Sequence, residues 1–313
     1  MSATAAVSYS KTRTAWFFLL LALASLMWSG QGTAVKVLSR HMGPIAITFL
    51  PFYITTLLFV PLLLKLRRAN PGATFPSAAD WVQFVIAGVA GQVLAQLGMT
   101  WGVDKSLASN GAILNLLIPV ISAVLASMLL KERLTTLRVV ALLVGLIGVV
   151  LMSVSDWKQA SFGEMRFLAG NLLILCGCLG SAFFNVYCKG LMRKFAEIEI
   201  LIYSYITASL ASVPLLIWAE PFSFRSLQRL DWQSWAAFAF LALFMYGASM
   251  LLFFKALQHL DVTTASASLY LVPVFGVILA AALLGERLGI LAISGAVIVL
   301  ASTVLIMKYD STT

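Results

Sequence analysis

Apolar residues in this chain form long runs without charges, most of them long enough to cross a lipid bilayer. A helix that spans a hydrocarbon core of about 30 Å needs about 20 largely apolar residues. The fifth run is short, but it can extend back to Leu134 if Arg138 reaches the headgroups. The pattern predicts an all-α membrane protein with ten transmembrane helices. The ten runs are 14–35, 42–64, 82–103, 106–130, 139–155, 167–188, 200–219, 232–254, 262–285 and 288–307.

Composition agrees with a chain built for lipid. Hydrophobic residues make up 61% of it and charged residues 11%, with a mean hydropathy of +0.98, whereas soluble domains are about a quarter charged. A β-barrel does not fit, because its strands alternate apolar and polar residues over about ten positions. The net charge of +9 comes from Lys and Arg near the ends of the runs, where they can meet lipid headgroups. We therefore expect membrane lipids as partners and no nucleic acid.

Basic residues between the runs set the expected orientation. With the N-terminus inside, thirteen Lys and Arg lie in cytoplasmic segments and eight lie outside, out of 21 in the chain. Cytoplasmic loops of membrane proteins carry the excess of basic residues. Both the N-terminus and the C-terminus are therefore predicted to be cytoplasmic.

The second half of the chain repeats the first. A shift of 154 positions aligns segment 117–137 with segment 271–291, with eleven identities in twenty-one positions. The identities include Pro119 with Pro273 and Glu132 with Glu286, which apolar bias alone does not produce. We therefore expect two five-helix repeats, residues 1–155 and 167–313. Because five is odd, the second repeat should enter the membrane from the opposite side, an inverted repeat that suits alternating access.

Three sequence features resemble those of a known family. They are the segment WSGQGTAVK at 28–36, the segments LLKERL and LLGERL, and the prolines of the fourth and ninth helices. On these features the chain is similar to the EamA type of the drug/metabolite transporter superfamily. The resemblance implies ten helices in a bacterial cytoplasmic (inner) membrane, a central cavity lined by helices 3, 4, 8 and 9 among others, and export or exchange of small metabolites, often amino acids. The chain departs from the pattern at Ser181, which takes the place of Trp28 at a shift of 153.

Polar side chains inside the predicted spans are the candidates for substrate binding. Gln92 and Gln96 lie four residues apart and so share a helix face, and the repeat places Tyr246 at the position of Gln92. Amides and phenols at this depth need partners. Those partners are either a solute in a cavity or other helices, and the sequence leaves both open. The full set of substrate-binding candidates is Gln31, Gln92, Gln96, Asn115, Tyr246, Ser266 and Tyr270.

The two repeated prolines are candidate hinges. Pro119 removes the hydrogen bond to the carbonyl of Asn115, and Pro273 does the same for Leu269. The freed carbonyls can bind a solute, or the prolines can mark kinks that packing fixes.

All twelve acidic residues lie outside the predicted spans. Glu132 and Glu286 are interpreted mainly as caps and ion-pair partners that lock the turns between helices 4 and 5 and between helices 9 and 10. Proton-driven antiporters usually keep an ionisable group inside the membrane, so we expect transport that does not strictly require a proton gradient. No metal-ligand cluster and no cofactor motif is visible, and we expect neither a metal nor a cofactor.

The leading function is a secondary transporter or facilitator for small organic metabolites, such as amino acids or related solutes, acting as an exporter or exchanger. The main alternative is an intramembrane enzyme, which would need a nucleophile with its base, a metal cluster or paired carboxylates. The spans offer only scattered Ser, Thr and Cys, so an enzyme is not expected. A membrane scaffold that transports nothing is the third class, and it gives no reason for two inverted halves.

Overall fold

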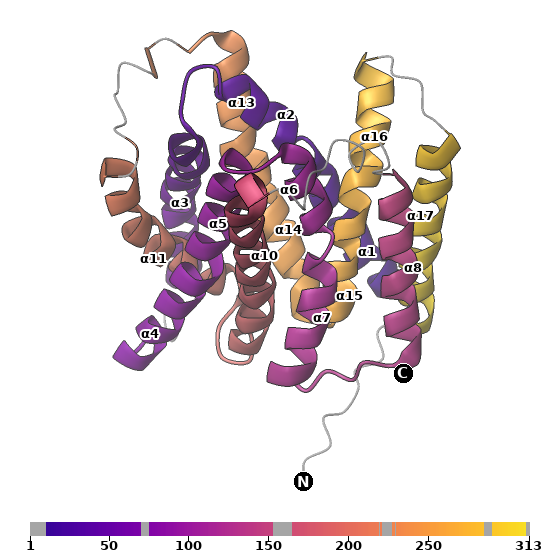
Figure 1. Cartoon of the computed structure of the whole chain (residues 1–313). Helices are drawn as coiled ribbons and strands as arrows, with labels where there is room; N and C mark the ends of the chain where they lie inside the picture. Colours follow the sequence, from indigo (N-terminus) through magenta and orange to yellow (C-terminus); the bar gives the residue numbers. More distant parts are fainter. Residues whose placement is uncertain are drawn as a thin grey trace.

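The computed structural model describes residues 11–69, 75–152, 165–218, 220, 227–228, 230–284 and 290–310. Its regular elements are all helices, of which η1 and η2 are π-helical and η3 is a 3-10 helix. In chain order they are α1 (Lys11–Ser29), α2 (Gln31–Leu38), α3 (Pro44–Ala69), α4 (Ala78–Ile86), η1 (Ala87–Val93), α5 (Leu94–Asp104), α6 (Ala108–Asn115), α7 (Ile118–Leu129), α8 (Thr136–Met152), α10 (Met165–Leu191), α11 (Glu197–Trp218), α13 (Trp232–Phe240), η2 (Leu241–Ala248), α14 (Ser249–His259), α15 (Val262–Ala267), η3 (Ser268–Tyr270), α16 (Leu271–Leu284) and α17 (Ile290–Asp310) (Figure 1).

Eight helical segments in the described part of the chain are long and apolar enough to cross a membrane. Two shorter apolar helices, Thr136–Met152 and Ile290–Ile306, fall on the fifth and tenth predicted runs. The chain is therefore a multi-pass α-helical membrane protein. The eight segments are Ala15–Leu38, Pro44–Ala69, Ala78–Asp104, Asn110–Leu129, Phe167–Leu191, Glu197–Trp218, Trp232–His259 and Val262–Leu279.

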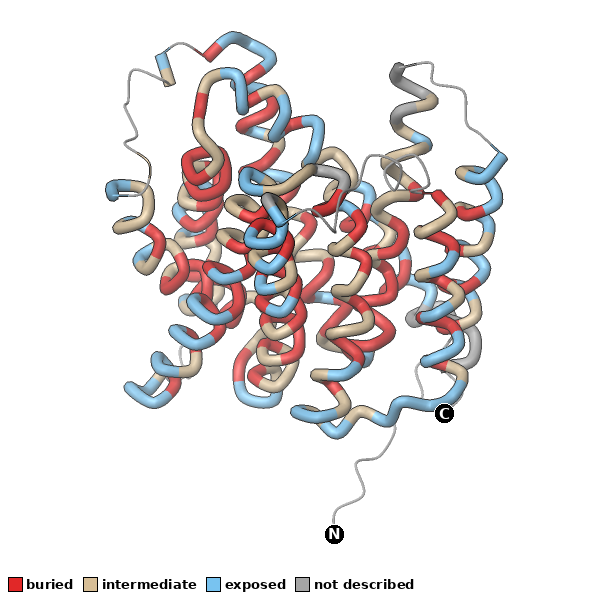
Figure 2. Tube along the Cα trace, in the orientation of Figure 1, coloured by how far each residue is buried: buried red, intermediate tan, exposed pale blue. Residues whose placement is uncertain are grey.

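The outer faces of the helices are apolar. Leu57, Met128, Leu210 and Val297 are each between 60% and 69% exposed, which would be costly in water for so many large side chains. Figure 2 shows the complementary pattern, with buried positions along the inner faces of the packed helices. These exposed faces are suited to contact with lipid chains.

Besides the π-helices in the third and eighth predicted runs, three further runs are interrupted by breaks in the α-helix. The first breaks at Gly30, between α1 and α2, and the fourth breaks between α6 and α7. The ninth is interrupted by η3, between α15 and α16. Pro119 and Pro273 each lie in the first turn after such a break, because proline lacks an N–H and its ring clashes with the preceding turn.

Helices of the two halves correspond at the shift found in the sequence. The π-helices begin at Ala87 and Leu241, 154 positions apart, and their α-helical leads α4 and α13 begin at the same spacing. The N-caps of those leads, Ser77 and Asp231, also keep this spacing. Packing follows the same rule, since α10 packs along α5 as α1 packs along α14, and α11 packs on η1 as α3 packs on η2.

Glycine pairs allow two of the helix seams to close tightly. A Cβ added to Gly98 of α5 would lie 2.5 Å from the backbone nitrogen of Gly177 in α10. A Cβ added to Gly148 of α8 would lie 2.9 Å from the carbonyl oxygen of Gly295 in α17. Small residues at such positions let membrane helices gain van der Waals contact between their backbones.

Candidate functional site

A buried polar cluster connects the repeat-related third and eighth spans. Gln92 belongs to η1, Gln96 to α5 and Tyr246 to η2. The Gln96 amide nitrogen donates to Gln92 Oε1 at 3.4 Å, and the Tyr246 hydroxyl donates to Gln96 Oε1, also at 3.4 Å. Both bonds are longer than the usual donor–acceptor distance of about 2.7–3.2 Å, which is most often about 2.9 Å. The cluster is therefore loosely satisfied, and its amides keep donors and acceptors for a further polar partner.

Hydroxyl groups from the second and seventh spans bind backbone carbonyls in and beside the two π-helices. A π-helical turn holds an extra residue, so its carbonyls are poorly paired within the helix and can accept from neighbours. These residues were not predicted from the sequence. The signal that could have found them is a hydroxyl or phenol group inside an apolar run. The bonds are Thr55 Oγ1 to the Ala242 carbonyl at 2.6 Å, the Tyr205 hydroxyl to the Tyr246 carbonyl at 3.0 Å, and Thr207 Oγ1 to the Phe84 carbonyl at 2.8 Å.

An aromatic group stands beside the amides. The ring of Phe52 in α3 lies 4.3 Å from the ring of Tyr205 and 5.3 Å, edge to face, from the ring of Tyr246. Such a group supplies apolar contact area next to the phenol and amide donors. Together the amides and aromatic rings suit a solute with both polar and apolar parts.

Two other candidates lie at helix breaks. Asn115 ends α6, directly before the break, and its Oδ1 accepts from Cys178 Sγ of α10 at 3.6 Å. Gln31 begins α2 directly after Gly30 and is half-buried. These two side chains lie at positions where the backbone departs from the α-helix.

Tyr270 and Ser266 lie in a different part of the core. Tyr270 packs against α8, where a Cβ on Gly145 would lie 2.7 Å from its ring. It belongs to a hydrophobic cluster separate from the one that contains Tyr246. Among the residues that the structure describes, the buried hydroxyls of Ser122, Ser266 and Tyr270 have no hydrogen-bond partner. The structure brings Tyr246 to the two glutamines but places Tyr270 against another helix.

Glu132 caps a helix of the opposite half. Its carboxylate accepts from the backbone N–H of Val262 at 2.8 Å and from the N–H and hydroxyl of Thr263 at 3.2 and 3.0 Å. These are the first residues of α15, so the carboxylate satisfies N–H groups that a helix start leaves unpaired. The sequence predicted that Glu132 caps the turn between helices 4 and 5, but its carboxylate instead caps α15, which lies on the ninth predicted run. Glu286 lies outside the described residues.

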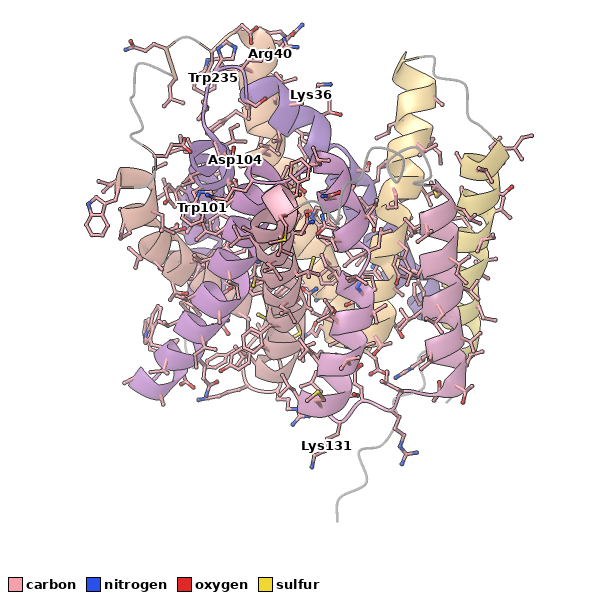
Figure 3. The ribbon with its side chains drawn as sticks, viewed as in Figure 1. Lys36, Arg40, Trp101, Asp104, Lys131 and Trp235 are labelled. Atoms are coloured by element: carbon pink, nitrogen blue, oxygen red, sulfur yellow. The ribbon has the colours of Figure 1, made fainter. Side chains whose placement is uncertain are left out.

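Two cations complete this contact. Lys189 Nζ at the end of α10 donates to the carbonyls of Leu257 at 2.7 Å and Gln258 at 3.1 Å, in the last turn of α14. Arg138 pairs with Asp261, the residue before α15. We call the side chains of Glu132, Arg138 and Lys189, with the segment 257–263 that they hold, the α14–α15 clamp. It lies at the end of the bundle that carries Lys131 (Figure 3).

Two carboxylates at helix N-termini have pKa values shifted in opposite directions. Burial raises the pKa of Glu132 above its ordinary value; the Val262 N–H acts against this shift, and nearby Asp261 adds to it. Hydrogen bonds from Ser234 lower the pKa of Asp231, the N-cap of α13. Glu132 is thus an acid whose protonation is coupled to the capping of α15.

A groove of 280 Å³ lies between α1, the α15–η3 segment and α17. Its lining is mainly aliphatic and aromatic, as at Phe18, Leu271 and Leu300. In this lining the Ser268 hydroxyl donates to the carbonyl of Ala265 and the Thr303 hydroxyl to that of Val299. The groove suits a hydrocarbon chain better than a zwitterion, and its lining includes no member of the Gln92, Gln96 and Tyr246 cluster.

Lipid-facing helices around a buried amide and aromatic cluster define a multi-pass membrane protein with a polar site inside its bundle. The model of the EamA-like transporter family matches the chain twice, over residues 15–154 and 168–308. The chain therefore belongs to the EamA-like transporter family, as the sequence resemblance implied.

Relatives over almost the whole length carry transporter names. An uncharacterized transporter of Archaeoglobus fulgidus is 24% identical and aligns with 93% of this chain and 98% of its own. A probable terminal-alkyne amino-acid exporter of Streptantibioticus cattleyicolor is 23% identical, covering 92% of each chain. An S-adenosylmethionine uptake transporter of Rickettsia prowazekii is 23% identical, covering 93% of this chain and 91% of its own. Family and relatives together indicate a small-molecule transporter.

A solved crystal structure has the same fold. It superposes with a TM-score of 0.76 at 16% identity and covers 94% of this chain and 96% of that one. At this identity the likeness describes the fold alone.

Proposed function

We propose that this transporter moves small neutral or zwitterionic metabolites, amino acids or related solutes, by alternating access across a bacterial cytoplasmic membrane. The observation that carries the proposal is the cluster of Gln92, Gln96 and Tyr246, in which a polar side chain from each half reaches the same buried site. An amide can bind both a carboxylate and an ammonium group, and it needs no buried charge. Export or exchange is the proposed direction.

The proposed architecture is ten spans in two inverted five-helix halves, with cytoplasmic termini. The shared spacing of π-helices, caps and helix contacts supports it, and so does the thirteen-to-eight excess of basic residues. Pro119 and Pro273 are the proposed hinges, because each follows a break in a span. The other four candidates are proposed to act near these breaks during the transport cycle and not as members of the central cluster. They are Gln31, Asn115, Ser266 and Tyr270.

The names of two relatives favour amino-acid chemistry. One is a probable amino-acid exporter and the other takes up S-adenosylmethionine, whose methionine portion carries an α-amino acid group. The shared chemistry is therefore an ammonium and a carboxylate on one carbon. The opposite directions of these two relatives leave the direction to experiment.

Counterflow in proteoliposomes tests the proposal. Vesicles loaded with an unlabelled solute should take up the same labelled solute faster than empty vesicles, and uptake should saturate. A panel of amino acids, amines and sugar derivatives identifies the class. Gln96→Leu should weaken the apparent affinity, whereas Ser127→Ala should not, because the exposed Ser127 hydroxyl bonds only its own helix. Protein that reconstitutes and melts normally but shows no counterflow with any amino acid would contradict the proposed substrate class.

A further inference from the structure

The repeat assigns a counterpart to each contact of Lys189. A shift of 153, which relates the first and sixth spans, places Lys36 at the position of Lys189. The shift of 154 that relates the third and eighth spans places Val103 and Asp104 at the positions of Leu257 and Gln258. Lys36 would therefore cap the end of α5 if both ends of the bundle adopted the same arrangement.

The two ends of the bundle are arranged differently in this structure. Lys189 is engaged with the last carbonyls of α14. The exposed Lys36 side chain makes no hydrogen bond or ion pair with the residues that the structure describes. Lys36 and Asp104 both lie at the end opposite Lys131 (Figure 3). Within the described residues, one lysine of the related pair is bonded and the other is not.

The helix that carries Lys36, α2, does not pack against the end of α5. The sixth span is one continuous helix, α10, up to Lys189, whereas the first span breaks at Gly30. After the break, α2 packs against α13 instead of the end of α5. A Cβ on Gly30 would lie 2.7 Å from the ring of Phe240 in α13, so a larger residue here would require the ring to shift.

The end of α5 is chemically suited to an ammonium group. The last carbonyls of a helix carry partial negative charge, and a lysine supplies three donors. The Val103 carbonyl already accepts from the Ser106 N–H at 3.2 Å but has a second lone pair for one of these donors. Asp104 adds a carboxylate that is exposed in this structure, where the other half has the neutral Gln258. An approaching Lys36 would meet both the carbonyls and the carboxylate.

We propose that Lys36 and Lys189 form an alternating pair of gate residues, of which only one caps its target helix at a time. In the present state Lys189 caps α14 and closes the Lys131 end. In the opposite state α2 turns about Gly30, Lys36 caps the last carbonyls of α5 and pairs with Asp104, and Lys189 leaves α14. The inference rests on the proposed alternating access. It adds the residues that hold each closed state.

Cross-linking in the membrane tests the exchange without any solute. The protein carries Lys36→Cys and Asp104→Cys, with the exposed Cys176 replaced by alanine, and a short bifunctional thiol reagent is added. Cross-linking should be slow, because α2 packs against α13 in the present state. Adding Lys189→Met removes the opposing contact and should raise the rate about fivefold, the effect expected for a charge at a helix end. Lys131→Gln, at the same end of the bundle, is the matched control and should leave the rate unchanged, because the Lys131 side chain contacts no hydrogen-bond or ion-pair partner among the residues that the structure describes.

A second variant keeps the test independent of the stability of the Lys189 variant. Lys36→Met alters an exposed side chain that has no partner in the described part of the chain, so the melting temperature should stay that of the wild type. It should nevertheless slow counterflow about fivefold. An unchanged cross-linking rate with Lys189→Met in folded protein, or wild-type counterflow with Lys36→Met, would overturn the exchange. Absence of counterflow in the wild type would instead count against the proposed function, while the cross-linking result would still report on the gate.

Discussion

The hydroxyl of Tyr246 donates to the side-chain oxygen of Gln96 at 3.4 Å, and this bond connects two spans that the internal repeat relates. Gln92, at the repeat position of Tyr246, accepts from the same Gln96 side chain. One side chain thus contacts both members of a repeat-related pair. A solute that entered between them would meet donors and acceptors from both halves at once.

Replacement of Gln96 should separate binding from stability. Gln96→Leu removes the amide at the centre of the cluster and should raise the apparent KM for the solute about fivefold, the value of one net hydrogen bond. The melting temperature should change little, because both bonds of this amide are long. Counterflow kinetics and thermal melting of the same preparation check this. A lower melting temperature with wild-type KM would mean that the cluster serves only helix packing.

Tyr270→Phe is the comparison variant. Its hydroxyl is buried without a partner among the described residues, and its ring packs against Gly145. Removal of an unpaired buried hydroxyl costs no hydrogen bond, so neither KM nor the melting temperature should worsen. A clear increase in KM would show that the Tyr270 hydroxyl contributes to solute binding.

Glu132 should give the protein a specific pH dependence of stability. Its pKa is raised in the folded state, mainly by burial, so the folded protein holds this proton more tightly than the unfolded chain. The resulting stability is full below the ordinary pKa of 4.5 and is lost as the pH rises through the raised value. Glu132→Gln cannot titrate, so the wild type should lose stability relative to it across that window. Thermal melting of both proteins as a function of pH measures the difference, and a constant difference would contradict the assignment.

Gly98→Ala should destabilise the seam between α5 and α10. The added Cβ would lie 2.5 Å from a backbone atom of Gly177, which cannot rotate away as a side chain can. Overpacking of this kind costs about 1–3 kcal/mol. Gly276→Ala is the control, because a Cβ there has no neighbour within 4 Å among the described residues. Equal melting temperatures for the two variants would show that the seam tolerates separation.

Cysteine labelling at Ala69 checks the orientation. Ala69 is the exposed last residue of α3, at the end of the basic segment that the charge rule assigns to the cytoplasm. Ala69→Cys in intact cells should resist an impermeant thiol reagent and react after the membrane is permeabilised. Rapid reaction in intact cells would invert the proposed topology.

The central cluster was predictable because two simple rules agree there. The four-residue spacing puts Gln92 and Gln96 on one helix face, and the repeat adds Tyr246. The same spacing joined Ser266 to Tyr270, but it could not predict which neighbour they face. The 3-10 turn at Ser268–Tyr270 changes the rotation per residue, and the Tyr270 ring lies against α8.

Residue spacing could not predict contacts between residues that are far apart in the sequence. The cap formed by Glu132 was expected, but its target was not, because a carboxylate in a loop can reach any nearby helix start. The break at Gly30 was also missed. Glycine inside an apolar run is more often a packing site in membrane helices than a break, so local sequence favoured an unbroken first span.

The matching positions of the two π-helices bear on how the chain evolved. Such a turn arises when one residue is inserted into an α-helix that keeps its flanking contacts. The insertions in the two halves begin 154 positions apart, at Ala87 and Leu241. Two separate insertions at matching positions are a less economical history than a single one copied later by gene duplication. On the proposed two-repeat architecture, we infer that the widened turn is older than the two-part chain and was already present in a five-helix ancestor.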